Sequence, residues 1–164
     1  MSLSAVLFYG YNLGSPENSG WEIEEEPDYG DFQAEWYEAY LESDEDESGD
    51  LKAHICRQIL LASAVDVGDT PWYSLDDKVK ATCGVEVLTY GHSNSEFIGI
   101  ALAGTVTIAD DWSPQLATCA LPDPMDTQEG EEPIDPHEPL QRALEALGVT
   151  PNQGHPSWVV APNE

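Results

Sequence analysis

Basic residues are scarce in this sequence of 164 residues, which has five Lys and Arg against 32 Asp and Glu. The formal net charge is −27 at pH 7, and the first basic residue is Lys52. Affinity for DNA or RNA depends on neutralising phosphates, and five basic side chains are too few to do this. We therefore expect no direct nucleic-acid binding. A surface this acidic attracts basic proteins instead.

Long apolar runs are also missing, since none approaches the roughly 18 residues that suggest a membrane span. Segment 1–11 lacks the basic and long apolar regions of a signal peptide. The three cysteines, Cys56, Cys83 and Cys119, make an odd number, as suits a reducing compartment. We therefore expect a cytoplasmic protein with no membrane association.

Recognisable metal-site spacing is absent, because no C-x-x-C or H-x-x-x-H pair occurs. Asp44-x-Asp46-x-Ser48-Gly49 matches the first half of an EF-hand loop. Ile55, however, stands where that loop needs a bidentate Glu, and Lys52 stands at its ninth position. We expect no specific metal site and assign Cys56 and Cys83 to the core, with Cys83 on the apolar face of a strand.

Catalytic motifs are missing too, since there is no G-x-S-x-G, P-loop or G-x-G-x-x-G sequence. Asp110 and Asp111 end a predicted strand, but nothing in the sequence supplies partners for them, and their role stays open. We expect a protein that is not an enzyme and that uses no cofactor.

Hydrophobic periodicity predicts three helices, over 32–41, 51–64 and 136–147. Asp31, Asp50 and Asp135 are the expected N-caps, and Gly148 is the expected end of the last helix. Phe32, Trp36 and Tyr40 mark the buried stripe of the first helix, with Tyr37 and Leu41 one position on. In the second helix, the apolar positions face the core, and we expect its polar residues to face outward, namely Lys52, His54 and Arg57. Lys52 and Arg57 should partly neutralise the preceding acidic loop.

Alternating apolar residues over 81–90 and 97–109 predict a long antiparallel hairpin with a bend or bulge near Gly104. Short strands are expected over 4–11 and 157–161, and 65–75 reads as a connection. The fold class is therefore α+β, with a mainly antiparallel sheet centred on the hairpin at about 81–109. A chain of this length suggests a single domain over 1–164, with acidic flexible segments near 42–50 and 122–135.

Acidic residues are densest in segment 22–50. Glu35, Glu38 and Glu42 recur at helical spacing, which places their Cβ atoms about 5–6 Å apart, an interval comparable with that of phosphates along a nucleic acid. This row runs directly into Ser43–Asp50. We predict that the partner-binding residues are Glu22, Glu24, Glu25, Glu26, Asp28, Asp31, Glu35, Glu38, Glu42, Asp44, Glu45, Asp46 and Glu47.

Both ends of the chain carry a resemblance. The segments Tyr9–Ser15 (YGYNLGS) and Leu144–Pro151 (LEALGVTP), with Pro156-x-Trp158, are similar to small acidic proteins encoded by actinobacteria and their phages. The shared motifs are turns and a helix cap, so they carry no functional residue across. The resemblance implies a phage or phage-exposed genome, in which small acidic proteins often act as inhibitors.

The leading hypothesis is an acidic, non-enzymatic inhibitor that mimics nucleic-acid phosphates and blocks a basic nucleic-acid-binding protein of the host or its defence systems. A toxin-immunity protein is a close variant, because its target would also be basic. The alternative is a small enzyme or ligand-binding protein whose acidity is an adaptation for solubility or salt. An even spread of charge around a polar pocket would favour that alternative, whereas one broad acidic face would favour the inhibitor.

Overall fold

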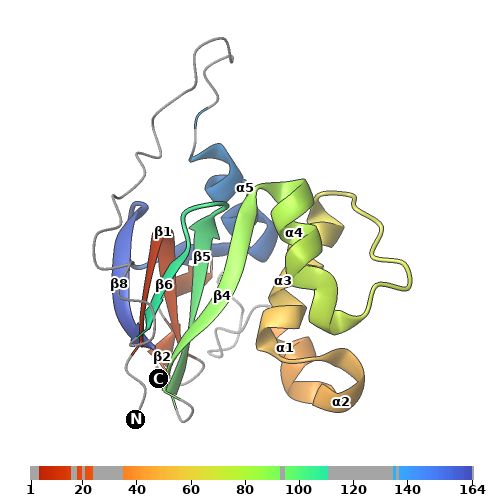
Figure 1. The fold of residues 1–164 in the computed structure, drawn as a ribbon. Helices are drawn as coiled ribbons and strands as arrows, with labels where there is room; N and C mark the ends of the chain where they lie inside the picture. The colour runs from red at the N-terminus through yellow and green to blue at the C-terminus, as the bar shows by residue number, and fades with distance from the viewer. Residues whose placement is uncertain are drawn as a thin grey trace.

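The computed structural model describes residues 4–15, 18–19, 21–23, 35–92, 95–110, 135 and 137–163. The fold is α+β, as predicted, with a mostly antiparallel sheet beside a group of helices (Figure 1). Within these residues no helix is long and apolar enough to cross a membrane.

The described strands form one larger and one smaller sheet. In chain order the strands are β1 (Ser4–Ser15), β2 (Asn18–Ser19), β3 (Trp21–Ile23), β4 (Val85–His92), β5 (Ser95–Leu102), β6 (Thr107–Asp110), β7 (Val149–Pro151) and β8 (Ser157–Asn163). The helices are α1 (Glu35–Glu42), α2 (Glu45–Ser48), α3 (Leu51–Ala62), the 3-10 helix η1 (Trp72–Ser74), α4 (Leu75–Cys83) and α5 (Glu138–Leu147).

Strand β1 is the centre of the larger sheet, whereas the sequence had suggested the hairpin. It pairs with β8 along one edge, and along its other edge with β6 at Ser4–Leu7 and with β5 at Gly10–Gly14. All these pairings are antiparallel. Gly10 permits the close approach of β1 and β5, because a Cβ there would lie 2.0 Å from the carbonyl oxygen of Ile100. Strands β3 and β7 form the smaller sheet.

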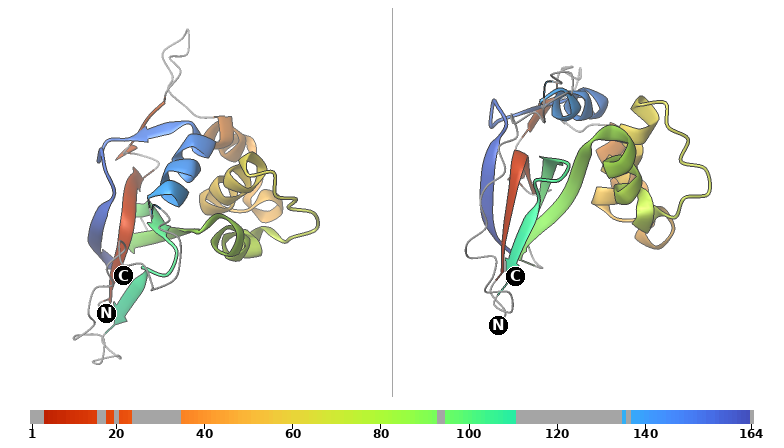
Figure 2. Two further views of the ribbon diagram at one scale, coloured as in Figure 1. Left: turned by 90° about the horizontal axis from the view of Figure 1, so that it is seen from above. Right: turned by 45° about the horizontal axis from the view of Figure 1, so that its top comes forward.

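Alternation along the strands gives the larger sheet two buried faces. Helices α1 to α4 lie to one side of the strands in all three ribbon views (Figures 1 and 2). The main core lies between these helices, α5 and the sheet, and includes Leu13, Ile55, Ile59, Val85 and Ile100. A second core is built from residues in or beside strands; its members include Val6, Phe8, Tyr90 and Ala101.

The three predicted helices are present as α1, α3 and α5, with shifted boundaries. The Asp50 side chain caps α3 by accepting a hydrogen bond of 2.9 Å from the Ala53 amide, as expected. Gly148 ends α5 in the left-handed conformation, with φ of +65°, also as expected. Helix α5 starts two residues later than predicted, because Asp135 accepts a hydrogen bond from the His137 amide and His137 is the N-cap residue.

Helix α4 is absent from the sequence prediction, which placed a connection over 65–75 and a strand from 81. Only Leu75 and Val79 of this helix are buried, so its apolar stripe is too narrow to produce clear periodicity. Its charge pattern was the usable signal, because Asp76 and Asp77 lie in the first turn and Lys80 in the last, complementing the helix dipole. Cys83 therefore ends a helix, and the prediction that it lies on a strand face is wrong.

The predicted hairpin is confirmed over β4 and β5, and its second strand breaks at Gly104. Gly104 has φ of +86°, and the Thr105 amide donates to the Leu102 carbonyl, which turns the chain between β5 and β6. The acidic segment near 42–50 includes the helical turn α2. The other acidic segment, 122–135, lies outside the described residues, apart from Asp135.

Candidate protein-binding surface

Helix α1 is held against the body of the protein by Trp36. This side chain is 6% exposed, and its indole Nε1–H donates a hydrogen bond of 3.0 Å to the carbonyl oxygen of Leu147. Tyr37 and Tyr40 are half-buried against the same core, whereas Leu41 is 54% exposed. Of the expected stripe, Trp36, Tyr37 and Tyr40 therefore face the core, Leu41 belongs to the outer surface, and Phe32 lies outside the described residues.

The chain turns after α1 through a small polar network. Ser43 Oγ donates to the Tyr40 carbonyl at 2.8 Å and lies 3.2 Å from His54 Nε2. Gly49 then turns the chain with φ of +89°, where a Cβ would lie 2.9 Å from the Trp72 ring. Arg57 donates to the Ser48 carbonyl at 3.0 Å and ties α2 to α3. Helix α2 is thus fixed in place beside α1.

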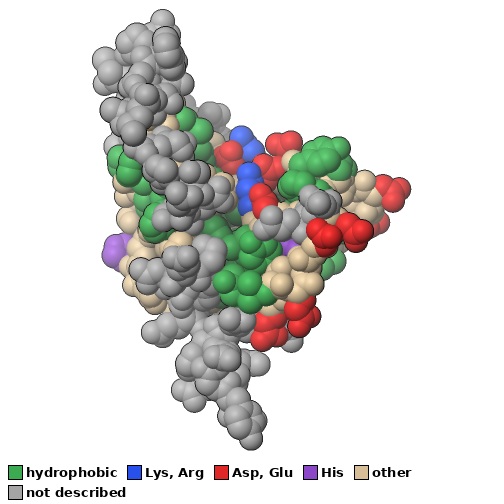
Figure 3. All heavy atoms as spheres, turned by 90° about the horizontal axis from the view of Figure 1, so that it is seen from below, with side chains coloured by type: hydrophobic (Ala, Val, Ile, Leu, Met, Phe, Trp, Pro, Cys, Tyr) green, Lys and Arg blue, Asp and Glu red, His purple; other side chains and the backbone are tan. Residues whose placement is uncertain are grey.

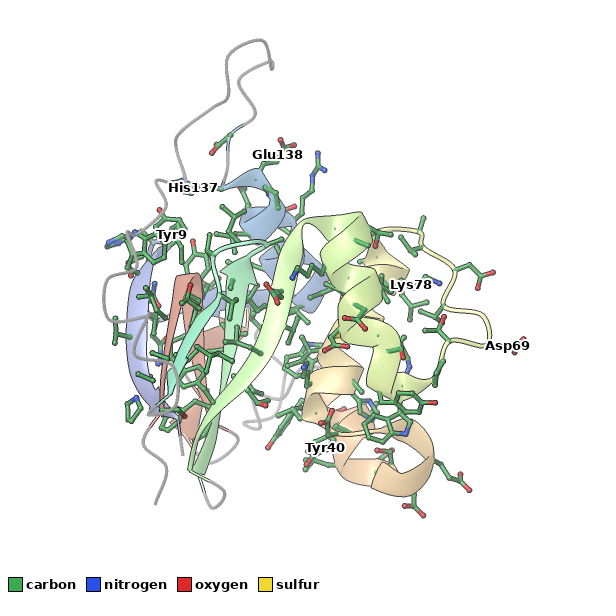
Figure 4. The ribbon with its side chains drawn as sticks, in the orientation of Figure 1. Tyr9, Tyr40, Asp69, Lys78, His137 and Glu138 are labelled. Atoms are coloured by element: carbon green, nitrogen blue, oxygen red, sulfur yellow. The ribbon has the colours of Figure 1, made fainter. Side chains whose placement is uncertain are left out.

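Four carboxylates point to solvent from this pair of helices, and we call them the α1–α2 acidic surface: Glu38, Glu42, Asp44 and Glu47. Tyr40 lies at the same end of the molecule (Figure 4). From below, acidic side chains are prominent on the helical side (Figure 3). The surface therefore combines negative charge with exposed apolar area at Leu41.

The five basic side chains of the protein are all described, and four of them bond to groups outside α1 and α2. Lys52 pairs with Asp76 at 2.9 Å, Lys80 pairs with Glu86 at 3.4 Å, and Arg142 pairs with Glu138. Lys78 donates to the Asp66 carbonyl, and Arg57 donates to the Ser48 carbonyl of α2. In the described part of the chain, Glu38, Glu42 and Glu47 form no ion pair.

The other predicted partner-binding residues are only partly visible. Glu35 starts α1, Glu45 and Asp46 lie in α2, and Glu22 lies in β3, all known from the backbone. The rest, Glu24, Glu25, Glu26, Asp28 and Asp31, lie outside the described residues. The structure therefore brings together the later half of the predicted set.

His54 is buried, at 7% exposure, and the prediction that it faces outward is wrong. Burial, with the nearby charge of Arg57, lowers the pKa of His54 below its ordinary value. Its ring meets the ring of Tyr40 edge-on at 5.7 Å. His54 therefore supports the chain between α1 and α2. Lys52 forms its ion pair with Asp76 of α4, so the prediction that Lys52 partly neutralises the acidic loop is wrong.

The two described cysteines, Cys56 and Cys83, are a buried and a half-buried side chain. Cys56 is fully buried in α3, and burial raises the pKa of its thiol to about 12, so it stays protonated at neutral pH. Cys83 is half-buried beside Ser63, and Cys119 lies outside the described residues. Among the residues that the structure describes, no group of three His, Cys, Asp or Glu side chains could hold a metal ion. Asp110 ends β6, and Asp111 is outside the described ranges.

A cluster that the sequence did not suggest joins β1, β8 and the start of α5. The Tyr9 hydroxyl and His137 Nε2 are 2.8 Å apart, and their rings stack at 5.8 Å (Figure 4). Trp158 meets the Tyr9 ring edge-on at 5.3 Å. Asp135 lies 3.9 Å from His137 Nδ1, too far for a hydrogen bond. These contacts anchor helix α5 to the sheet and do not form a catalytic relay.

Comparison of the chain with protein-family models, with curated proteins and with solved structures finds no match. The described surfaces, their charges and their contacts are therefore the basis on which a function can be assigned.

Proposed function

We propose that this protein is a non-enzymatic inhibitor that binds a basic, nucleic-acid-handling protein through the α1–α2 acidic surface. The observation that carries this proposal is the distribution of the five basic side chains: Lys52, Lys80 and Arg142 pair with carboxylates of other elements, Lys78 donates to the Asp66 carbonyl, and Arg57 donates to the Ser48 carbonyl at the end of α2. Glu38, Glu42 and Glu47 form no ion pair among the described residues, so their negative field can act on a partner in place of that of phosphates.

The helical geometry supports such mimicry. Glu38 and Glu42 are one turn apart on α1, so their Cβ atoms lie about 5–6 Å from each other. A regular row of negative charge steers a basic partner during diffusion and raises the association rate. Exposed Leu41 lies between them in sequence and supplies apolar area for the docked state. The Trp36 hydrogen bond to Leu147 and the Arg57 hydrogen bond to Ser48 hold α1 and α2 in position.

The resemblance to acidic proteins of actinobacteria and their phages supports a target in host defence or nucleic-acid metabolism. A restriction or CRISPR effector, a polymerase or a DNA-packaging protein has the required basic, nucleic-acid-binding groove. Binding there would compete with the natural nucleic acid. The protein itself should show no saturable binding to DNA or RNA in a gel-shift assay at physiological salt.

The test is affinity capture from an actinobacterial lysate with three immobilised proteins. These are wild type, the Glu38→Gln/Glu42→Gln variant of α1, and the Glu138→Gln/Glu145→Gln variant of α5. Both variants remove two negative charges from helix surfaces, so they match in net charge. The α5 variant also breaks the Glu138–Arg142 ion pair, which lies outside α1 and α2. Retained proteins are identified by mass spectrometry after elution with duplex DNA.

The expected result is a basic nucleic-acid-binding protein that wild type and the α5 variant retain, that DNA releases, and that the α1 variant loses. The affinity of the purified pair should fall steeply with added salt, because screening weakens charge steering. Equal retention by the α1 and α5 variants would show that the α1–α2 acidic surface is an ordinary solvated face and would overturn the proposal.

A further inference from the structure

A hollow of about 260 Å³ lies between β4 and β6, two strands that do not pair with each other. On one side it is lined by consecutive residues of β4, including Val87, Leu88 and Thr89. On the other side it is lined by Val106 and Ile108. Because the lining follows the strand, the hollow is a groove along the outer edge of β4.

The backbone of β4 has outward-facing hydrogen-bonding groups along this groove. The Ala103 amide donates to the Gly84 carbonyl, which makes residues 84 and 103 a hydrogen-bonded pair. Such pairs alternate along an antiparallel ladder, so even-numbered residues of β4 bond to β5. The N–H and C=O groups of Val87 and Thr89 therefore point away from β5. No strand among the described residues pairs with this edge.

The two walls of the groove differ in chemistry. One wall is apolar, formed by Leu88 and Val106 over the second core and by Ile108, which is 52% exposed. The other is the charged lip of α3 and α4, where Lys52 pairs with Asp76. Figure 3 shows basic and acidic side chains beside a hydrophobic patch on this side of the molecule.

The lip carries a small net negative charge. Lys52–Asp76 and Lys80–Glu86 are neutralised pairs, and Asp77 forms no ion pair among the described residues. A strand lying in the groove would point alternate side chains towards the apolar wall and the charged lip. Apolar residues suit the first set of positions, and basic residues suit the second.

We propose that the outer edge of β4 binds an extended segment of a partner protein, with apolar residues at alternate positions and basic residues between them. The segment adds to the sheet as a further strand, with backbone hydrogen bonds to Val87 and Thr89. A second copy of this chain is a poor occupant, because each copy carries a charge of −27 and the copies repel. The inference does not depend on the α1–α2 acidic surface.

The test uses two synthetic peptides of equal length and composition. In one, Lys and Val alternate; in the other, all Lys residues precede all Val residues. Binding is followed by amide NMR shifts at physiological salt, where exposed charges are screened beyond about 8 Å. The alternating peptide should bind saturably and shift the amides of Val87 and Thr89 most, whereas the Leu88 amide, which faces β5, should shift less.

Three variants test the edge itself. Thr89→Pro removes one outward N–H, which an edge strand tolerates, and should weaken the alternating peptide at least tenfold. Thr89→Val keeps that N–H and should bind as wild type does. Ile108→Ser shortens the apolar wall at an exposed position and should also weaken binding, so the test remains decisive if Thr89→Pro does not fold.

Equal binding of both peptides, or unchanged binding by Thr89→Pro and Ile108→Ser, would show attraction by charge alone and overturn the strand-addition site. The Glu38→Gln/Glu42→Gln variant is measured in parallel. It should keep the shifts at Val87 and Thr89, because α1 does not line the groove. This comparison distinguishes a loss of peptide binding at β4 from a loss of partner binding by the α1–α2 acidic surface.

Discussion

The Trp36 indole donates a hydrogen bond to the Leu147 carbonyl, joining two residues 111 positions apart in the chain. This contact attaches the acidic helix α1 to the end of α5. Because Leu147 is also buried, water cannot replace the bond if the indole is removed. The position of the α1–α2 acidic surface thus depends on a buried aromatic side chain behind it.

Replacing Trp36 should destabilise the protein much more than replacing the exposed Leu41. We expect Trp36→Ala to lower the free energy of unfolding by about 3–5 kcal/mol, the usual cost of truncating a buried Trp. Trp36→Phe should cost about 1–3 kcal/mol, because it leaves the Leu147 carbonyl unsatisfied. Leu41→Ala should stay within about 0.5 kcal/mol of wild type in urea denaturation. Similar losses for Trp36→Ala and Leu41→Ala would contradict this assignment.

Salt should stabilise the fold, because the net charge of −27 repels itself. Raising NaCl from 0.01 M to 0.1 M shortens the Debye length from about 30 Å to about 10 Å. The melting temperature should rise across this range in calorimetry, and it should rise less for Glu38→Gln/Glu42→Gln. A melting temperature that does not change between these two salt concentrations would mean that the charges are too dispersed to affect stability.

His54 should titrate below its ordinary pKa, which lies near 6.5, because burial and Arg57 disfavour its charged form. A histidine with a lowered folded pKa contributes stability above the unfolded pKa and loses it as the pH falls through the folded value. NMR titration of the ring measures the shift directly. Comparing unfolding of wild type and His54→Gln at pH 7 and pH 5 should show a smaller acid loss in the variant. If the measured pKa of His54 has the ordinary value, the His54 ring is exposed to solvent and its assignment as buried is contradicted.

The Tyr90 hydroxyl is buried without a hydrogen-bond partner in the described part of the protein, so Tyr90→Phe should keep or raise stability at pH 7. Burial raises the pKa of Tyr90 to about 12, against an ordinary value near 10. A raised folded pKa gives stability below pH 10 that is lost between pH 10 and 12. Wild type should therefore lose about 3 kcal/mol more than Tyr90→Phe across this window in urea titrations. Equal losses of unfolding free energy in wild type and Tyr90→Phe would show that the Tyr90 hydroxyl is hydrated.

The sequence by itself determined the features that depend on neighbouring residues. Asp50 and Gly148 cap their helices because capping needs only the few adjacent amides and carbonyls. The β4–β5 hairpin and the break at Gly104 follow from alternation and one glycine. The excess of carboxylates is likewise a property of composition, and with it the kind of partner that we propose.

Tertiary structure decided what depends on contacts between distant segments. Nothing local reveals that β1, and not the hairpin, is the strand that pairs with β2, β5, β6 and β8, because strand pairing is non-local. His54 has helical spacing suited to the outside, yet Tyr40 and Ser43 fold over it and bury it. Likewise, the groove at β4 exists because β6 pairs with β1, and no strand in the described part of the chain pairs with the outer edge of β4. Glu38, Glu42 and Glu47 form no ion pair among the described residues, because folding pairs Lys52, Lys80 and Arg142 with other carboxylates, a distribution that charge counts alone cannot show.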